Sequence, residues 1–205
     1  MRTIKIILKG LLFLAGVCAA AWFFMPWRQI GESVIIRASK TATVSYSSVK
    51  DASGGFEVRG LKLQRLAGMA DVSCESLTVR LDPTASLLSL APTFHLSFTG
   101  AAVGDISMLA KKMPGVSFGD GRAEVSVGLG GILIDGIRSN GDLSLSGLML
   151  LNMGAPRPIV RAEVSMNVKD EAFETDTLSN LGKMLPITQE SPGHWVMRRA
   201  PNDRT

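Results

Sequence analysis

The residues that could carry out chemistry are few and lie far apart. His95 and His194 are the only histidines. Neither has a Cys, an Asp or a second His at the spacing of a metal site or a catalytic pair. His95 lies on the polar side of the alternating stretch FHLSF, and His194 lies beside Trp195 near the C-terminus. We interpret both histidines as exposed side chains with no catalytic role.

Motifs for nucleophilic catalysis and for phosphate binding are incomplete. The sequence has no G-x-S-x-G nucleophile elbow. Residues 128–131 read GLGG, but Leu133 stands where a dinucleotide fingerprint needs its third glycine, and no helix is expected to follow. Asp120 and Asp142 belong to turn sequences and form no carboxylate pair. We therefore predict that the protein is not an enzyme and holds no cofactor and no metal.

The two cysteines give no sign of a disulfide framework. Cys18 lies within an apolar run near the N-terminus, whereas Cys74 lies in a predicted strand. Residues in such different surroundings are poorly placed to pair. We interpret Cys74 as a small buried apolar side chain.

Length and charge narrow the class of protein. The chain has 205 residues, which suggests one domain with an appendage. Its net charge of +4 comes from Arg2, Lys5, Lys9 and Arg28, because no acidic residue precedes Glu32. Removing these four from the 22 basic residues leaves 18, which balances the 18 acidic ones. A nucleic-acid partner is therefore not expected, since such proteins concentrate positive charge on one face.

The N-terminal segment is predicted to be a transmembrane anchor. Residues 10–27 carry no charged side chain, a run near the lower limit for spanning ~30 Å of hydrocarbon. Basic residues precede this run, which predicts a cytoplasmic N-terminus, and Pro26 is expected to end the helix. The apolar side chains assigned to the anchor, including an aromatic belt at its outer end, are Leu11, Leu12, Phe13, Leu14, Val17, Trp22, Phe23, Phe24 and Trp27.

Two alternatives to the anchor are a signal peptide cleaved at the small residues 19–21 and a lipoprotein site at Cys18. All three interpretations send the rest of the chain out of the cytoplasm, which in a bacterium means the periplasm. We divide the chain into a cytoplasmic stub and anchor at residues 1–28, a periplasmic antiparallel β domain at 29–199, and a disordered tail at 200–205.

The body of the chain alternates apolar and polar residues with a period of two, which predicts half-buried strands. An Asp-Gly pair at residues 120–121 and an Asn-Gly pair at 140–141 are typical of type I′ hairpins. We predict eight to ten antiparallel strands in a meander. The clearest alternating stretches are residues 43–48, 76–81, 94–98, 123–129, 142–150 and 160–168.

Helical patterns are scarce in this body. Residues 103–113 form one candidate helix, with Asp105 as its N-cap and Pro114 after its end. Residues 87–90 are consistent with a helical turn or with a strand edge, and residues 176–185 form a second weak candidate.

The stretch GFEVRGLKLQRL shifts its alternation by one position at Gly60, and a similar shift occurs between Cys74 and Leu77. Such a shift at glycine is typical of a β-bulge, which bends a strand. Bulged strands that are apolar on one face predict a curved sheet, either closed over an ordinary core or open as an apolar trough. The candidate apolar concave face comprises Phe56, Leu63, Val79, Phe94, Phe98, Val125 and Leu145.

Four short motifs occur in an order that is similar to a known family. They are V-x-G-L-x-L at residues 58–63, L-D-P-x-x-S-L-L at 81–88, F-x-G at 98–100 and G-x-L-x-L-x-x-L at 141–148. With the anchor ahead of them, they resemble the type II secretion system protein N family, within the wider AsmA-like group of periplasmic β-proteins. The resemblance covers most of residues 5–199.

This resemblance implies a single-pass inner-membrane protein whose main domain lies in the periplasm, where it acts as an accessory secretion component through contacts with other secretion or envelope proteins. The AsmA-like relatives are associated with lipid passage along a curved apolar sheet, which makes phospholipid the alternative partner. A third interpretation is a tethered structural domain of other purpose. Neither family offers a catalytic residue to carry over.

Overall fold

Antiparallel pairing of neighbouring segments builds most of the chain. A computed structural model describes residues 24–39, 43–66, 70–108, 111–129, 131–152, 159–181 and 186–199. Within these residues, eleven strands form one sheet in the order β1-β3-β4-β5-β8-β9-β10-β11-β13-β12, with β2 paired to β3. Two further strands, β6 and β7, pair with each other. The prediction of a mainly β chain is confirmed, with more strands than expected.

The strands are β1 (Thr43–Ser45), β2 (Ser48–Ala52), β3 (Gly55–Leu66), β4 (Ala70–Leu81), β5 (Thr93–Val103), β6 (Ile106–Met108), β7 (Lys111–Met113), β8 (Val116–Gly128), β9 (Gly131–Ser139), β10 (Leu143–Leu151), β11 (Ile159–Val168), β12 (Ile187–Ser191) and β13 (His194–Arg199). The helices are α2 (Trp27–Ala38), α3 (Pro83–Ser89), α4 (Glu171–Phe173), the π-helical turn η1 (Glu174–Leu178) and α5 (Ser179–Leu181).

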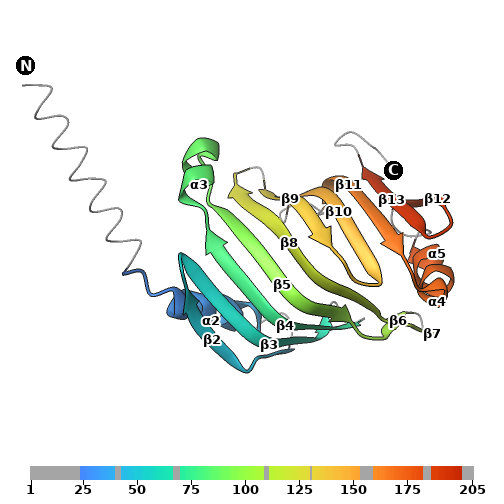
Figure 1. Cartoon of the computed structure of the whole chain (residues 1–205), viewed down its shortest axis with the longest axis horizontal. Coiled ribbons are helices and arrows are strands. Elements are labelled where there is room, and N and C mark those ends of the chain that lie inside the picture. Colours follow the sequence, from blue (N-terminus) through green and yellow to red (C-terminus); the bar gives the residue numbers. More distant parts are fainter. Residues whose placement is uncertain are drawn as a thin grey trace, which may run out of the picture.

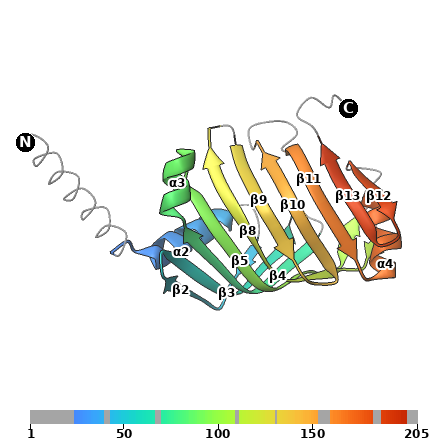
Figure 2. The ribbon, with the colours of Figure 1, turned by 45° about the horizontal axis from the view of Figure 1, so that its top comes forward.

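The sheet is open and strongly curved (Figures 1 and 2). A line of glycines crosses its N-terminal half. Gly60 in β3, Gly100 in β5 and Gly119 in β8 have φ angles of 61°, 58° and 63°, a left-handed conformation that glycine adopts without steric cost. The strand register places Gly60 and Gly100 on either side of Glu75 in β4. The irregularity is therefore shared by adjacent strands, and the sheet bends along a common line.

The shift of alternation predicted at Gly60 is confirmed, but it is not a one-sided bulge. Arg59 pairs with Ser76, and Leu61 pairs with Cys74, so the register between β3 and β4 is the same on both sides of Gly60. The alternation of apolar and polar residues therefore shifts in β3 and in β4 at the same level of the sheet. Apolar side chains therefore stay on one face of the sheet beyond the bend.

Helix α2 covers the N-terminal end of this apolar face. Trp27 and Ile35 from the helix pack with Val49, Phe56 and Val58 from β2 and β3 in one buried cluster. The backbone N–H of Arg28, free at the helix start, donates to Asp51 Oδ1 at 2.7 Å. The sequence analysis did not predict this helix.

A second cluster covers the C-terminal end of the same face. Phe173 and Leu178 from the α4–η1–α5 segment pack on Val164 and Met166 of β11 and on Trp195 of β13. The segment overlaps the helix expected at 176–185, of which 182–185 lie outside the described residues. Strand pairing from β3 through β4, β5, β8, β9 and β10 to β11 connects the two clusters across a single face.

Among the described residues, none of the helices has the length and apolar character needed to cross a bilayer. The predicted anchor residues Leu11 to Phe23 lie outside the described residues. Phe24 is 86% exposed, whereas Trp27 is only 6% exposed. Trp27, which we assigned to the outer aromatic belt of the anchor, instead packs against the sheet as part of α2.

Two local predictions were wrong. Residues 103–113, expected as a helix, contain β6 and β7, in which Ile106 pairs with Met113. A run this short gains too little from helix propensity to exclude strand pairing. Asp120 and Gly121 lie inside β8 rather than in a hairpin turn. By contrast, Asn140 and Gly141 do connect β9 to β10, and residues 87–90 contain the end of helix α3.

Candidate functional site: an apolar strip on the sheet

An apolar strip crosses the middle of the sheet between the two covered ends. Its side chains are half-buried, and within the described residues they belong to neither buried cluster. Phe94 pairs with Leu81 on one side and with Val125 on the other, and Val125 pairs with Ile134. We call the following set the apolar strip: Leu77, Phe94, Leu96, Phe98, Val125 and Ile134.

The strip is formed by direct cross-strand neighbours. Leu77 lies opposite Phe98, and Phe98 lies opposite Gly121. A side chain at Gly121 would collide with the Phe98 ring. The space that a side chain at Gly121 would need is thus taken by the Phe98 ring and by the backbone carbonyl of Arg138.

The structure divides the seven predicted concave-face residues into several groups. Phe94, Phe98 and Val125 belong to the apolar strip. Phe56 and Val79 are directly opposite each other and belong to the α2 cluster. Leu145, opposite Met166, packs on the C-terminal cluster, and Leu63 lies beyond the bend, opposite Val72 and Val44. All seven share one face, but only three lie in its open part.

Sequence reasoning omitted three residues of the strip. Leu96 lies between Phe94 and Phe98 in the same alternation, and Leu77 continues the alternation of Val79. Both were therefore detectable from the period-two pattern. Ile134 was harder to assign, because Gly136 (φ 57°) interrupts β9 and the register with β8 shifts between Arg122 and Glu124.

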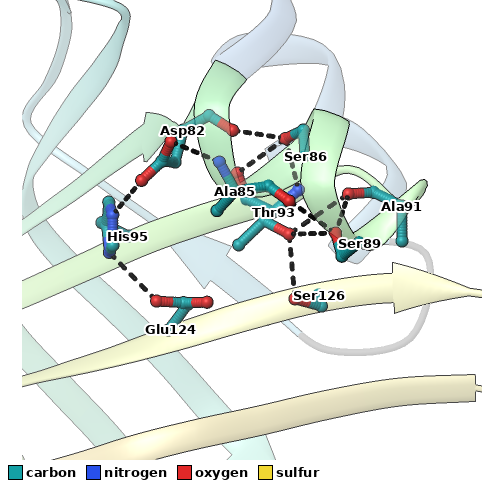
Figure 3. A network of polar contacts seen from close by, with 9 residues as sticks. All are labelled: Asp82, Ala85, Ser86, Ser89, Ala91, Thr93, His95, Glu124 and Ser126. Carbon is teal, nitrogen blue, oxygen red and sulfur yellow. Dashed lines mark hydrogen bonds and ion pairs between the residues drawn. The ribbon is translucent and has the colours of Figure 1, made fainter.

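The opposite face of the same strands is polar. His95 Nε2 lies 2.8 Å from Asp82 Oδ2, and its Nδ1 lies 3.8 Å from Glu124 Oε2 (Figure 3). Asp82 accepts a hydrogen bond from the backbone N–H of Ala85 at 2.9 Å. This bond, followed by the contact with His95, lowers the pKa of the Asp82 carboxyl. His95 is thus an exposed strand residue with two acidic neighbours.

Within the described part of the chain, no group of three or more His, Cys, Asp or Glu side chains could hold a metal ion. Cys74 is buried, its Sγ lies 3.0 Å from the carbonyl oxygen of Ser76, and burial raises the pKa of the thiol. The chemistry that the strip offers is the removal of apolar surface from water.

The family model described as "Type II secretion system protein GspN-like, Synergistales" matches residues 4–199. The match covers nearly the whole chain, including the predicted anchor and every strand of the sheet. The chain belongs to this family. Neither the curated proteins nor the solved structures yielded a significant match.

Membership of the GspN-like family gives the strip a context. The resemblance inferred from the four short motifs is confirmed at the level of the family. Two of those motifs lie at the strip in this GspN-like chain: Val58 of the first belongs to the α2 cluster and pairs with Leu77 of the strip, and the third begins at Phe98 within the strip. The matched residues 4–199 include every strand of the open, curved sheet.

Proposed function

We propose that this GspN-like chain is a single-pass component of the inner membrane that supports type II secretion by binding other secretion proteins in the periplasm. The family match supports the role in secretion. The charge-free run at residues 10–27, preceded by basic residues, supports the anchor and its orientation. The proposal assigns no bond-making step to any residue.

The observation that carries the proposal is the half-buried apolar strip between two well-covered ends. A sheet face with this composition is normally covered by another layer. Here α2 covers β2 and β3, and the α4–η1–α5 segment covers β11 and β13. The strip residues on β4, β5, β8 and β9 form the part of the face that a partner would cover.

A second candidate function is the shielding of lipid. The strip continues without a break into the apolar side chains of both clusters, on a sheet that is curved along its length. Acyl chains laid along it would gain about 0.8 kcal/mol for each buried CH₂ group. The same residues would serve either ligand, so the two functions must be separated by identifying what touches the strip.

Site-specific photo-crosslinking in the native host makes this separation. A benzophenone amino acid would replace Leu96 or Val125 in the strip, and Ser97 or Arg122 on the opposite face of the same strands as matched controls. Adducts with secretion proteins at the strip positions alone would support the first function. Lipid adducts at those positions alone would support the second function and contradict the first.

Topology needs its own test. Fusion of alkaline phosphatase after Thr205 should give active enzyme, because the phosphatase matures only outside the cytoplasm. Fusion of green fluorescent protein at the same point should stay dark. The reverse pattern would contradict the periplasmic location without bearing on the family.

A further inference from the structure

Apart from Phe24, which precedes α2, the most exposed large apolar side chains of the described residues lie away from the strip, on two neighbouring turns. Leu87, Leu88 and Leu90, at the end of α3, are 76%, 83% and 93% exposed. Leu129, in the turn between β8 and β9, is fully exposed. We call these four residues the leucine tip.

The two turns lie next to each other at the same end of the strands (Figures 1 and 2). The backbone N–H of Val127 donates to the carbonyl oxygen of Pro92 at 2.9 Å. The hydroxyls of Thr93 and Ser126 are 2.9 Å apart. These bonds connect the segment after α3 to the hairpin that carries Leu129, so the four leucines lie together at one end of the strands.

Helix α3 presents its polar side to the protein and its apolar side to solvent. Ser86 Oγ accepts from the backbone N–H of Thr93 at 2.9 Å, and Ser89 Oγ lies 3.3 Å from Thr93 Oγ1 (Figure 3). Asp82 caps the start of the helix, and no residue of α3 is buried. Leu87 and Leu88 therefore contribute nothing to a core, although they are the largest side chains of the helix.

The backbone of Leu90 adds a second unusual feature. Its φ of 52° is the only positive φ of a non-glycine residue among the residues described. Glycine or asparagine normally occupies such a helix end, because a branched side chain is strained there. A strained, exposed leucine gives the fold no advantage, and strain of this kind is commonly tied to function.

The chemistry of the tip is purely apolar. Residues 83–94 and 125–134 contain no charged side chain, although the strands just below them carry Arg80, His95 and Glu124. The tip lies on two turns at the end of the strands. An apolar tip next to charged residues can be buried without a complementary pocket if it enters a lipid bilayer. The apolar side chains then lie among the lipids, and the charged ones stay at the headgroups.

From this geometry we propose that the leucine tip inserts into the surface of a lipid bilayer. The four leucines enter the region between headgroups and acyl chains, and Arg80 stays at the level of the phosphates. The proposal rests in part on the proposed anchor, which would keep the chain at a membrane. It adds a second point of contact, formed by the folded domain itself.

Photo-crosslinking of the full chain in vesicles of phosphatidylethanolamine and phosphatidylglycerol tests the insertion. The benzophenone amino acid would replace Leu88 or Leu129 at the tip, Thr99 on the polar face as the control, and Phe13 in the anchor. We expect lipid adducts at positions 88 and 129 and none at 99. Absence of lipid adducts at the tip, or adducts only with a second copy of the chain, would overturn the proposal.

The anchor position separates the two proposals. Lipid adducts at position 13 without adducts at 88 and 129 would leave the anchor standing and overturn the tip. Adducts at 88 and 129 without any at 13 would support the tip and overturn the anchor. A chain that does not float with the vesicles at all would overturn both.

A double variant tests whether the leucines themselves cause the insertion into the bilayer. Leu87→Ser with Leu88→Ser should reduce the lipid adduct at position 129 at least about tenfold, because two apolar side chains no longer leave water. Its thermal unfolding should stay unchanged, since neither residue is buried. An unchanged adduct yield in this folded variant would overturn the proposal.

Discussion

Gly60 in β3 and Gly100 in β5 adopt the same left-handed backbone conformation at the same level of the sheet, separated only by Glu75 of β4. The two strands on either side of β4 are thus irregular at one level of the sheet. A side chain added at Gly100 would collide with that of Glu75, and one added at Gly60 would collide with Ser47 Oγ. The bend in the sheet therefore depends on glycine at both positions.

Replacing Gly60 with Val should destabilise the fold. The substitution forces a β-branched residue to φ 61° and creates the collision with Ser47. We expect a loss of about 1–3 kcal/mol in the free energy of unfolding, measured by thermal or denaturant unfolding of the purified protein. Gly104→Val is the control, because an added side chain there meets only ordinary contacts with Asp71. Equal stability of the two variants would contradict the bend.

Gly136→Ala distinguishes backbone strain from collision. Gly136 has φ 57°, yet nothing lies within 4 Å of the position where a side chain would begin. The loss should therefore be smaller than for Gly60→Val, about 1 kcal/mol. The same unfolding measurement checks this order, and a loss as large as that of Gly60→Val would show that collision has no part in the Gly60 effect.

Trp27→Ala should detach α2 from the sheet. Trp27 is 6% exposed and packs with Val49, Phe56 and Val58. Removal of a buried aromatic side chain typically costs about 3–5 kcal/mol. Val34→Ala, on the exposed side of the same helix, should cost little, since Val34 is 53% exposed. Chemical denaturation compares the two variants, and similar losses would refute the packing assigned to α2.

Glu174 should make stability depend on pH. Its Oε1 accepts from Trp195 Nε1 at 2.9 Å, from the backbone N–H of Gly193 at 2.7 Å and from Gln189 Nε2 at 2.7 Å. These bonds, with the Trp195 bond the largest cause, lower the pKa of the carboxyl. The charged form therefore stabilises the fold fully above the ordinary glutamate pKa of about 4.3, and this contribution is lost as pH falls through the lower folded pKa.

The variant Glu174→Gln measures this contribution. The difference in melting temperature between wild type and variant should be largest near pH 7 and should narrow below about pH 4. Glu171→Gln, at an exposed position in the neighbouring helix turn, is the control and should show little difference at any pH. A difference for Glu174→Gln that stayed constant from pH 7 to pH 3 would contradict the assignment.

Asp82→Ala should loosen α3. The carboxylate accepts from the backbone N–H of Ala85 and contacts His95 Nε2. Without this cap the first turn of α3 loses a hydrogen-bond acceptor. Hydrogen exchange should become faster at the Ala85 amide and stay unchanged in β10. Unaltered exchange at Ala85 would mean that the cap does not hold the helix.

Much of the sheet could be predicted from the sequence, because apolar residues that alternate with a period of two indicate a strand with one buried face. Phe94, Phe98 and Val125, which follow that alternation, are cross-strand neighbours in the apolar strip. The Asn-Gly pair at 140–141 connects two strands as expected. The same logic misplaced Asp120, whose side chain accepts the backbone N–H of Gly100. Pairing with a neighbouring strand decides whether an Asp-Gly or Asn-Gly pair forms a hairpin turn or stays within a strand.

Helix α2 was missed for a different physical reason. Pro26 was interpreted as the end of an anchor helix, although proline is equally suited to a helix start. Residues Trp27, Ile30 and Ile35 do lie on one side of the helix. The signal existed in the sequence, but the end of the apolar run obscured it. The open state of the strip had no sequence signal, because alternation is the same whether or not another layer covers the face.

The most direct test of the central claim is a secretion assay in the native host with the polar substitution Leu96→Gln in the apolar strip. Ser97→Gln, on the opposite face of the same strand, is the matched control. Our account predicts that Leu96→Gln accumulates as a folded protein yet fails to restore secretion to a strain that lacks the chain, whereas Ser97→Gln restores it. Normal secretion with Leu96→Gln would contradict the claim that the strip is the working surface.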